Sequence, residues 1–286
     1  MDSTEIFKRF DSLKTGRGTW ESHWEEIAER VLPRSAEFTG ERTQGDKRTH
    51  KLYDATAALA LERFSAAVES LLTPRGATWH TLRSTNPELN RDDEVRLWFD
   101  NVQQTMFAHR YSPKANFAGQ THEGYMSLGA FGTGITFVDE APTRGAIYRA
   151  IHLADAFIAE NEHGQIDTVF RRFEVSARQA MRMFEDGDLS DDLRKTANDK
   201  PDEKVKLLHV VMPRTDRDPT RRDRKNTPWF SGYYEIKTKN LIEEGGFETM
   251  PYIVSRYVTG PRETYGRSPC MTILPDIKMI NEMSKT

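Results

Sequence analysis

Histidine, cysteine and acidic side chains are the residues here that could bind a metal ion or activate water, but their spacing does not form the motifs that such sites usually show. His122 and Glu123 are adjacent, yet Gly124-Tyr125 follows them, so the helix of a metalloprotease is not completed. A single cysteine excludes the usual thiolate zinc sites, and no GxSxG motif occurs. We therefore predict no catalytic residue, no metal site and no cofactor. Carboxylates from distant segments can still meet in a fold, which leaves a metal-dependent nucleic-acid enzyme as an alternative.

The glycine-rich stretch SLGAFGTGITF is the nearest approach to a phosphate-binding loop. A dinucleotide-binding loop follows a strand and opens a helix, whereas the apolar pattern here ends a helix and opens a strand. No Lys-Ser or Lys-Thr pair follows, so the stretch is not a P-loop. We predict instead that Gly132 and Gly134 reverse the chain in a confined space, and that Gly266 forms a further structural turn.

The strongest charge feature is the segment from residue 213 to residue 228, which we predict to be an exposed loop. Its six basic and three acidic side chains give a net charge of +3. Arginine side chains match phosphate oxygens, so the loop could contact a nucleic-acid backbone without reading its sequence. It could equally pair with acidic residues of a neighbouring subunit, or simply be solvated. The basic residues are Arg214, Arg217, Arg221, Arg222, Arg224 and Lys225.

Composition limits the class of protein. The chain has 286 residues, of which 37% are hydrophobic and 30% charged, with a mean hydropathy of -0.71 and a net charge of -3. This balance excludes a globally basic nucleic-acid binder. Cys270 has no partner for a disulfide within the chain, which favours a reducing compartment and a small buried side chain. No apolar run is long enough for a membrane helix, and the N-terminus lacks a signal core, so we expect a soluble protein.

The apolar periodicity predicts helices first, then mostly strands, then a final helix, which is an α+β order. Trp20, Trp24, Ile27 and Val31 define one helical face. Ser268-Pro269 is a cap-plus-proline signal that opens the last helix. The expected helices cover residues 19–33, 54–72, 91–110, 112–132, 176–197 and 268–286, and the expected strands cover 134–140, 145–153, 156–175, 204–214, 229–238 and 250–258.

Smaller local features complete the prediction. The polar segment 34–50 is expected to be a mobile loop. His163-Gly164 indicates a hairpin turn, Asp92-Asp93 a helix N-terminus and Glu243-Glu244 a turn. Pro275 lies inside the final helix, where it should kink the helix or delay its start.

Several segments, taken in order along nearly the whole chain, resemble the portal or head-to-tail connector proteins of short-tailed bacteriophages. None is specific alone, and the resemblance depends on their order and spacing. They are WEEIAERVLPRSAEF, LYDATAALALERFSAAVESLLTPRGATWHTL, LGAFGTGITFVDE, HGQIDTVFRRFEVSARQ, HVVMPRTD, FSGYYEI, GGFETMPYIVSRY and YGRSPCMTILPDIKMIN.

The resemblance implies a non-catalytic ring, commonly of twelve subunits, at one vertex of the virion capsid, assembled in the host cytoplasm and not bound to a membrane. Double-stranded DNA would pass through it without sequence specificity. Its partners would be a terminase motor, tail adaptor proteins, and capsid and scaffold proteins. A monomeric virion adaptor is the other alternative.

By the same resemblance the chain would divide into four regions and stop partway through a helix, since family members are longer and the final apolar pattern has no stop signal. The regions are a helical wing-like part (1–133), a β-rich wing part (134–203), a clip-like part containing the basic loop (204–258) and the start of a stem-like helix (259–286).

Overall fold

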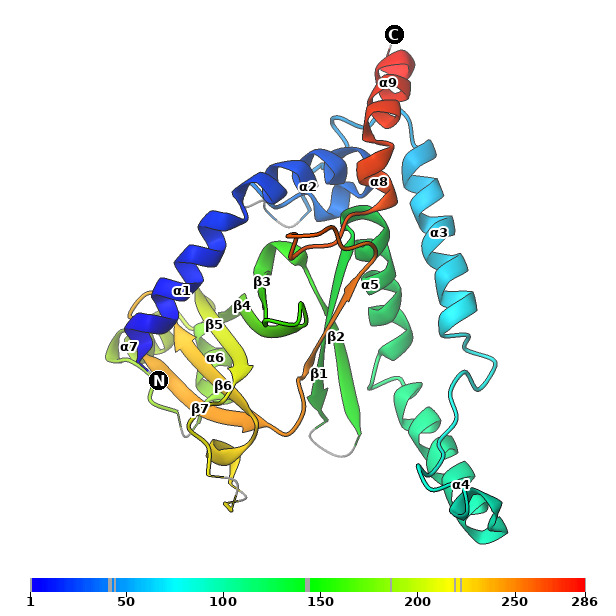
Figure 1. Cartoon of the computed structure of the whole chain (residues 1–286). Helices are drawn as coiled ribbons and strands as arrows, with labels where there is room; N and C mark the ends of the chain where they lie inside the picture. Colours follow the sequence, from blue (N-terminus) through cyan, green and yellow to red (C-terminus); the bar gives the residue numbers. More distant parts are fainter. Residues whose placement is uncertain are drawn as a thin grey trace.

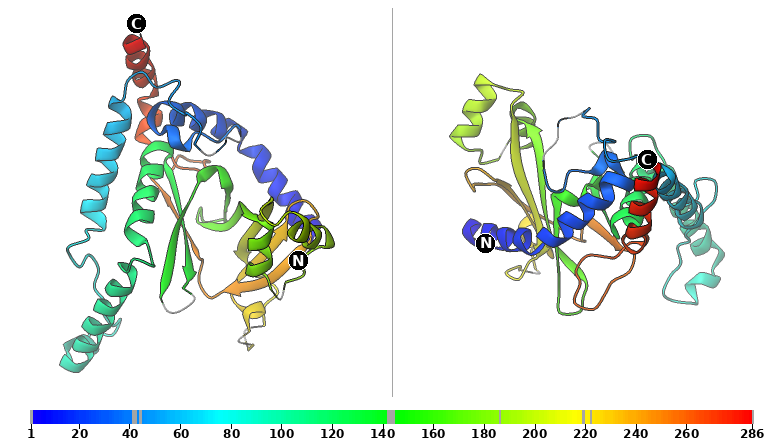
Figure 2. Two further views of the ribbon diagram at one scale, coloured as in Figure 1. Left: turned by 180° about the vertical axis from the view of Figure 1, so that it is seen from behind. Right: turned by 90° about the horizontal axis from the view of Figure 1, so that it is seen from above.

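The computed structural model confirms the predicted α+β class: helices dominate the first half of the chain and antiparallel strands most of the second (Figure 1). Helices α3, α4 and α5 form one side of the molecule, and the N-terminal end of α1 lies with α7 on the opposite side (Figure 2). The structure describes residues 2–40, 43, 45–141, 145–185, 187–218, 220–221 and 223–285.

Five α-helices precede the first strand in the described part of the chain. α2 carries the predicted apolar face, because Trp24, Ile27 and Val31 are fully buried. The Asp92 carboxylate accepts the N–H of Glu94 and caps α4, which confirms the helix N-terminus predicted there. The helices are α1 (Ser3–Gly16), α2 (Gly18–Val31), α3 (Thr56–Leu72), α4 (Asp93–Arg110) and α5 (Phe117–Phe131), with short 3₁₀ turns η1 (Pro33–Ser35) and η2 (Leu89–Arg91).

A three-stranded antiparallel sheet follows α5 in the order β2-β1-β8. Its central strand β1 pairs Ile135 with Ile151 of β2 on one side and with Val254 of β8 on the other. α5 packs on β1 and β2, so this sheet has a helical layer on one face (Figure 1). The strands are β1 (Thr133–Glu140), β2 (Ala146–Ile151) and β8 (Tyr252–Arg256).

A second antiparallel sheet has five strands in the order β3-β4-β5-β6-β7. The predicted hairpin turn at His163-Gly164 is confirmed: Gly164 has a φ of 72° between β3 and β4. α1 covers one part of this sheet through Phe7 and Phe10, which pack with buried residues of β3 to β6. The strands are β3 (Ala156–Glu160), β4 (Ile166–Ser176), β5 (Lys204–Pro213), β6 (Trp229–Glu235) and β7 (Leu241–Phe247), with 3₁₀ turns η3 (Leu153–Asp155) and η4 (Arg224–Asn226).

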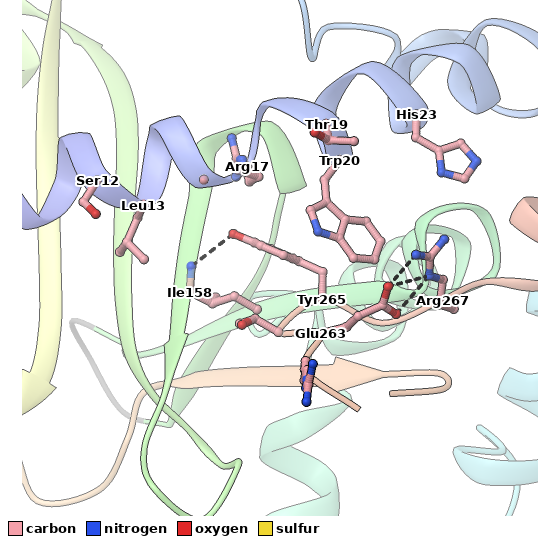
Figure 3. A pocket seen from close by; sticks show the side chains of 13 residues that line it. Ser12, Leu13, Arg17, Thr19, Trp20, His23, Ile158, Glu263, Tyr265 and Arg267 are labelled. Atoms are coloured by element: carbon pink, nitrogen blue, oxygen red, sulfur yellow. Dashed lines mark hydrogen bonds and ion pairs between the residues drawn. The ribbon is translucent and has the colours of Figure 1, made fainter. Parts of the chain in front are cut away.

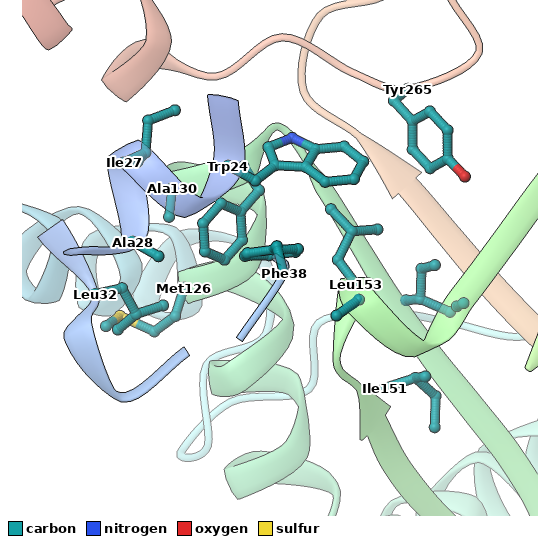
Figure 4. Close-up of a cluster of buried hydrophobic side chains, with 14 of the residues drawn as sticks. Trp24, Ile27, Ala28, Leu32, Phe38, Met126, Ala130, Ile151, Leu153 and Tyr265 are labelled. Atoms are coloured by element: carbon teal, nitrogen blue, oxygen red, sulfur yellow. The ribbon is translucent and has the colours of Figure 1, made fainter. Parts of the chain in front are cut away.

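The largest core cluster lies where α2, α5 and the two sheets meet (Figure 4). Trp24 sits at its centre, with ring centroids 5.5 Å from Phe38 and 5.0 Å from Tyr265. These aromatic contacts join a helix, an irregular segment and the approach to the last helix. The core therefore depends on residues far apart in the sequence.

Segment 34–50 was predicted to be a mobile loop, and this is wrong for its first part. Ala36 and Phe38 are buried in the main core, at 0% and 7% exposure. The backbone N–H of Phe38 donates to the Glu25 carboxylate at 2.7 Å, which fixes the segment against α2. Two apolar residues in a polar stretch carry no periodicity, so the sequence pattern did not predict their burial.

Three predicted elements differ in the structure. The helix expected from Ser112-Pro113 begins at Phe117, because Asn116 is in the left-handed region and the preceding residues form a turn. The helix expected over 176–197 is two helices, α6 (Ala177–Met183) and α7 (Asp191–Asp199). The pair Glu243-Glu244, expected in a turn, lies within β7.

The final helix begins as predicted, with the Ser268 hydroxyl accepting the N–H of Met271 and Pro269 in the first turn. It is interrupted at Ile273, so that α8 (Pro269–Thr272) precedes α9 (Leu274–Lys285), in agreement with the effect expected of Pro275. Three isoleucines recur at helical spacing in this segment, and the interruption places them differently. Ile277 is buried, whereas Ile273 and Ile280 are 46% and 42% exposed. Among the described residues, no helix is both long and apolar enough to cross a membrane.

Candidate partner interface

The basic loop connects β5 to β6 and lies at the end of the five-stranded sheet (Figure 1). Its aspartates hold its own backbone. The Asp218 carboxylate accepts the N–H of Thr220 at 3.0 Å, and the Asp223 carboxylate accepts the N–H of Lys225 at 3.0 Å. The Thr220 hydroxyl also donates to this carboxylate at 2.7 Å, and this bond, followed by the bond from the N–H, lowers the pKa of Asp218. The interleaved acids therefore shape the loop as well as reduce its net charge.

Arg214 does not belong to the exposed basic surface that the sequence predicts. Its side chain is only 6% exposed and packs over the ring of Phe230. One guanidinium nitrogen donates to the Glu244 carboxylate at 2.8 Å, and the other donates to the carbonyl of Gly245 at 2.9 Å. Arg214 therefore joins β5 to β7 inside the chain. Its partner could not be predicted because Glu244 was expected in a turn.

Four other basic side chains of the loop stand in solvent. Arg217, Arg221, Arg224 and Lys225 are exposed, and Arg221 pairs with Asp223 at 3.1 Å. Arg222 lies outside the described residues. An exposed ion pair of this kind is weak, so even Arg221 can exchange its partner for another anion.

A wide cleft of about 950 Å³ borders this loop, between the end of β1, the strands β6 and β7, and α6. Among the described residues that line it, five carboxylates face the single guanidinium of Arg224. Among the described residues, four of these carboxylates make no ion pair, and the exception is Asp223. The exposed cations of the loop therefore stand beside a strongly acidic hollow. The acidic residues are Asp139, Glu140, Asp223, Glu243 and Glu248.

The three glycines singled out in the sequence lie at close backbone contacts. Gly132 caps α5 in the left-handed region, with a φ of 77°, and a Cβ there would collide with the backbone carbonyl of Gly266. A Cβ on Gly266 would in turn collide with the carbonyl of Gly132. Gly134 lies equally close to the backbone of Gly124. The chain before α8 therefore crosses the end of α5 at a distance that only glycine permits.

The terminal helix is held at both ends. Ser268 donates its hydroxyl proton to the carbonyl of Ala130 at 2.7 Å, which attaches α8 to the last turn of α5. Asn281 of α9 is only 3% exposed. Its Oδ1 accepts the N–H groups of Tyr53 and Asp54, at 2.8 and 3.1 Å, and its Nδ2 donates to the carbonyl of Lys51 at 2.9 Å. One side chain thus satisfies three backbone groups of an irregular segment.

A second hollow, of about 560 Å³, lies between the α1–α2 junction and residues 262–267 (Figure 3). Arg267 stacks on Trp20, with its guanidinium carbon 4.8 Å from the ring centroid, and pairs with Glu263. Burial, followed by the positive charge of Arg267, lowers the pKa of His23 at its rim. Arg267 and Glu263 are thus engaged with one another, and the exposed Arg262 also lines the hollow.

Nothing in the described part of the chain groups three potential metal-ligating side chains of His, Cys, Asp or Glu. Burial raises the pKa of the Cys270 thiol to about 11, so its thiolate is scarce at neutral pH. The functional surface is therefore one of charge and shape. The sequence pattern did not identify Asn281 or the buried Arg17. For Asn281, the only available signal was a polar residue at a core position of the helical apolar pattern.

Comparison with known proteins agrees with the resemblance found in the sequence. The family described as "Bacteriophage head to tail connecting protein" matches residues 3–286. The chain is 29% identical over 279 residues to the "Probable portal protein" of Bordetella phage BPP-1, covering 96% of this chain and 50% of the relative. It is 27% identical over 289 residues to the "Portal protein" of Salmonella phage epsilon15, covering 99% of this chain and 52% of the relative. The chain spans about half the length of the curated relatives it matches.

Proposed function

Because the chain belongs to the family of bacteriophage head-to-tail connecting proteins, we propose that it acts in a portal: a ring at one capsid vertex through which double-stranded DNA enters and leaves the head. The observation that carries this proposal is the family match over nearly the whole chain, together with two relatives that are named as portal proteins. The role is structural, and the protein is a component of the virion assembled in the host cytoplasm.

The ring would contain several copies, commonly twelve, and would meet a terminase motor, tail adaptors, and capsid and scaffold proteins. In this proposal residues 1–133 and 134–203 are wing-like and residues 259–286 begin a stem-like helix. β4 pairs with β5 across the boundary at residue 203, so the β-rich regions share one sheet. We therefore give the clip-like role of residues 204–258 to the loop end of that sheet.

The exposed basic loop is the part of this surface whose charge suits a partner. Arg217, Arg221, Arg224 and Lys225 lack apolar neighbours within the loop that would bury them, so they are free to contact acidic protein side chains or DNA phosphates. The acidic cleft beside the loop would repel a DNA backbone that entered it. A partner therefore contacts a positively charged loop beside a negatively charged cleft, and this arrangement fixes the orientation in which it binds.

The portal proposal is tested by the particle that the protein forms. Light scattering after size exclusion, followed by negative-stain imaging, should reveal closed rings with a central hole wide enough for duplex DNA. Incubation with DNA and magnesium or manganese should leave the DNA intact. DNA cleavage that co-purifies with the chain and disappears with a carboxylate variant would contradict the structural role.

The role of the loop is tested by reversing its charge. Arg221→Glu with Arg224→Glu should reduce adaptor binding or DNA packaging at least roughly tenfold, because two cations become anions beside an acidic cleft. The matched control is Arg96→Glu, which reverses an exposed cation on the distant helix α4. Packaging and adaptor binding that both stay at the control level would exclude a role for the loop.

A further inference from the structure

The outer edges of the two sheets differ in how their backbone groups are satisfied. The edge of β2 is capped: the N–H of Tyr148 donates to the carbonyl of Ala115 at 3.0 Å, and that of Ala150 donates to the side chain of Gln120 at 2.7 Å. Such capping prevents another strand from pairing with an edge.

The edges of the five-stranded sheet are also covered. On β3, the N–H of Ile158 donates to the Tyr265 hydroxyl at 3.3 Å, and the carbonyl of Ala156 accepts from Arg17 at 2.6 Å. On β7, the carbonyl of Ile242 accepts the N–H of Asp188 at 2.8 Å. These bonds satisfy part of each outer edge of this sheet.

The outer edge of β8 has no such cover. Val138 donates its N–H to the carbonyl of Pro251, and Tyr257 donates to the carbonyl of Gly132, each at 2.9 Å. In an antiparallel pair of strands, residues whose backbone groups bond to the neighbouring strand alternate with residues whose backbone groups point away from it. These two bonds therefore show that the backbone groups of Ile253 and Ser255 bond to β1, whereas those of the residues on either side of them point away from β1. Within the described residues, the outward N–H and C=O groups have no hydrogen-bond partner; they belong to the half-buried Val254 and Arg256 and to Tyr252, which is only 4% exposed.

The surface next to this edge is apolar. Ile253, Tyr257 and Val258 are 52%, 46% and 54% exposed, although each is large and hydrophobic. An open row of backbone donors and acceptors beside apolar side chains is the surface that an added strand requires. The occupant that fits is a short extended segment of polypeptide.

The same chain carries a candidate segment of this kind outside its two sheets. Residues 78–84 run between α3 and α4 without forming a helix or strand, although TWHTLRS is rich in aromatic and β-branched residues. The indole of Trp79 donates to the Tyr111 hydroxyl at 3.0 Å, and the N–H of Leu82 donates to Gln103 of α4 at 3.2 Å. The segment is thus attached to the helical arm through the Trp79 side chain and the Leu82 backbone.

The backbone of this segment is free on its outward side. Thr81 and Arg83 flank Leu82, whose N–H faces α4. Both residues are exposed, and neither N–H has a hydrogen-bond partner in the described part of the chain. One copy therefore presents an unpaired segment on its arm and an unpaired strand edge on its body.

We propose that residues 79–83 of one copy add as a strand to the free edge of β8 of the next copy. This inference rests on the proposed ring, because the two surfaces are different and a contact between them is head-to-tail, as ring closure requires. Pairing of β8 with β8 of a second copy would instead make a two-fold dimer, which is one outcome of the test.

Proline at an outward position removes the N–H that the added strand needs and leaves the pairing with β1 intact. Because the Val254 side chain packs against the main core, the fold of Val254→Pro is checked first by urea unfolding. The folded variant should self-associate roughly tenfold or more weakly than wild type, as measured by sedimentation over a concentration series. Val254→Thr is the matched control, because it retains the N–H in a side chain of similar shape. Hydrogen exchange should also slow at Val254 when the wild-type chain associates.

The partner segment is tested in the same way. Thr81→Pro should weaken association as much as Val254→Pro, while the control Thr81→Val should not. An equimolar mixture of the two proline variants should form heterodimers that grow no further, because only one intact segment and one intact edge remain per pair. This behaviour is specific to a head-to-tail contact.

Three results would overturn the inference: a wild-type chain that stays monomeric, association that survives Val254→Pro, or a dimer that is lost with Val254→Pro but unaffected by Thr81→Pro. The last would assign β8–β8 pairing. A failure of the portal proposal can be distinguished from a failure of the strand contact. Closed rings that persist in Val254→Pro would refute the strand contact alone, whereas open, proline-sensitive oligomers would refute the ring alone.

Discussion

The imidazole Nδ1 of His209 lies 2.7 Å from the hydroxyl oxygen of Tyr252, and this hydrogen bond joins β5 of the five-stranded sheet to β8 of the three-stranded sheet. Nε2 lies 2.9 Å from the Ser231 hydroxyl, and the ring stacks on Tyr233 with a centroid distance of 4.2 Å. His209 is fully buried, and burial, with a smaller contribution from the charge of Arg171, lowers its pKa from 6.5 to about 3.

This burial makes the free energy of unfolding depend on pH. The unfolded chain binds a proton at His209 below about pH 6.5, whereas the native chain does not until about pH 3. The contribution of His209 to the free energy of unfolding is therefore fully present above pH 6.5 and is lost progressively as the pH drops from 6.5 towards 3. Between pH 7 and pH 4.5 we expect His209 to account for a loss of roughly 2–3 kcal/mol, measured by urea unfolding.

The variant His209→Gln should remove that part of the pH dependence, although it should also be less stable than wild type at pH 7. His163→Gln, at the exposed β3–β4 turn, is the matched control and should keep the wild-type slope. Equal slopes for His209→Gln and wild type between pH 7 and pH 4.5 would show that the imidazole is not held neutral.

A second prediction concerns Asn281, which satisfies the backbone of Lys51, Tyr53 and Asp54 from α9. Asn281→Leu keeps a similar volume but leaves three backbone groups without a partner. We expect the free energy of unfolding to fall by about 2–4 kcal/mol, since each orphaned buried group costs about 1–3 kcal/mol and part of the segment can reach water. Hydrogen exchange at Tyr53 and Asp54 should accelerate in the same variant.

Ser284→Ala on the exposed side of α9 is the control for Asn281, because its contact with Asp54 is long, at 3.5 Å. It should change stability by less than about 0.5 kcal/mol. If Asn281→Leu unfolded at the same urea concentration as this control, the attachment of α9 to the backbone of residues 51–54 would not depend on the Asn281 amide.

A third prediction follows from the crossing of Gly132 and Gly266. Gly132→Ala places a Cβ against the Gly266 carbonyl and also forces a non-glycine residue into the left-handed region. We expect a loss of about 2–4 kcal/mol in the free energy of unfolding, from the dihedral cost of about 1 kcal/mol plus the displaced backbone. Gly76→Ala, which meets open space, should stay within about 0.5 kcal/mol of wild type.

Local sequence signals predicted the parts of this fold that depend on neighbours in the chain. The apolar face with Trp24, the Ser268-Pro269 helix start and the Gly164 turn are each set by residues within a few positions of one another, and all three are confirmed. The burial of Phe38 could not be predicted in this way. It depends on α2 and α5, which are brought together only by the complete fold.

The candidate interface shows the same limit. The density of arginine in loop 213–228 is visible in the sequence, and four of its cations are exposed. The exception, Arg214, is buried by a strand that follows thirty residues later along the chain. The parity of β8, on which the strand-addition contact depends, likewise requires the register with β1, and hydrophobic pattern alone does not specify it.

The last prediction concerns Arg17, which is 1% exposed at the junction of α1 and α2. Its guanidinium donates to the carbonyls of Leu153, Ala154 and Ala156 at 2.6 to 2.8 Å and pairs with Glu21. The guanidinium carbon also lies 3.7 Å from the centre of the Phe157 ring. A lysine ammonium has three donors on one atom and cannot reproduce this planar fork.

We therefore expect Arg17→Lys to lower the free energy of unfolding by about 3–5 kcal/mol, as for other buried ionic networks that lose a partner, even though the charge is conserved. Arg17→Met should cost at least as much, because methionine has no donor for the three carbonyls of residues 153–156. The control is Arg96→Lys on the exposed face of α4, which should be nearly neutral in the same urea titration. An Arg17→Lys variant within about 1 kcal/mol of wild type would show that charge, rather than the geometry of the fork, holds α1 and α2 to the turn before β3.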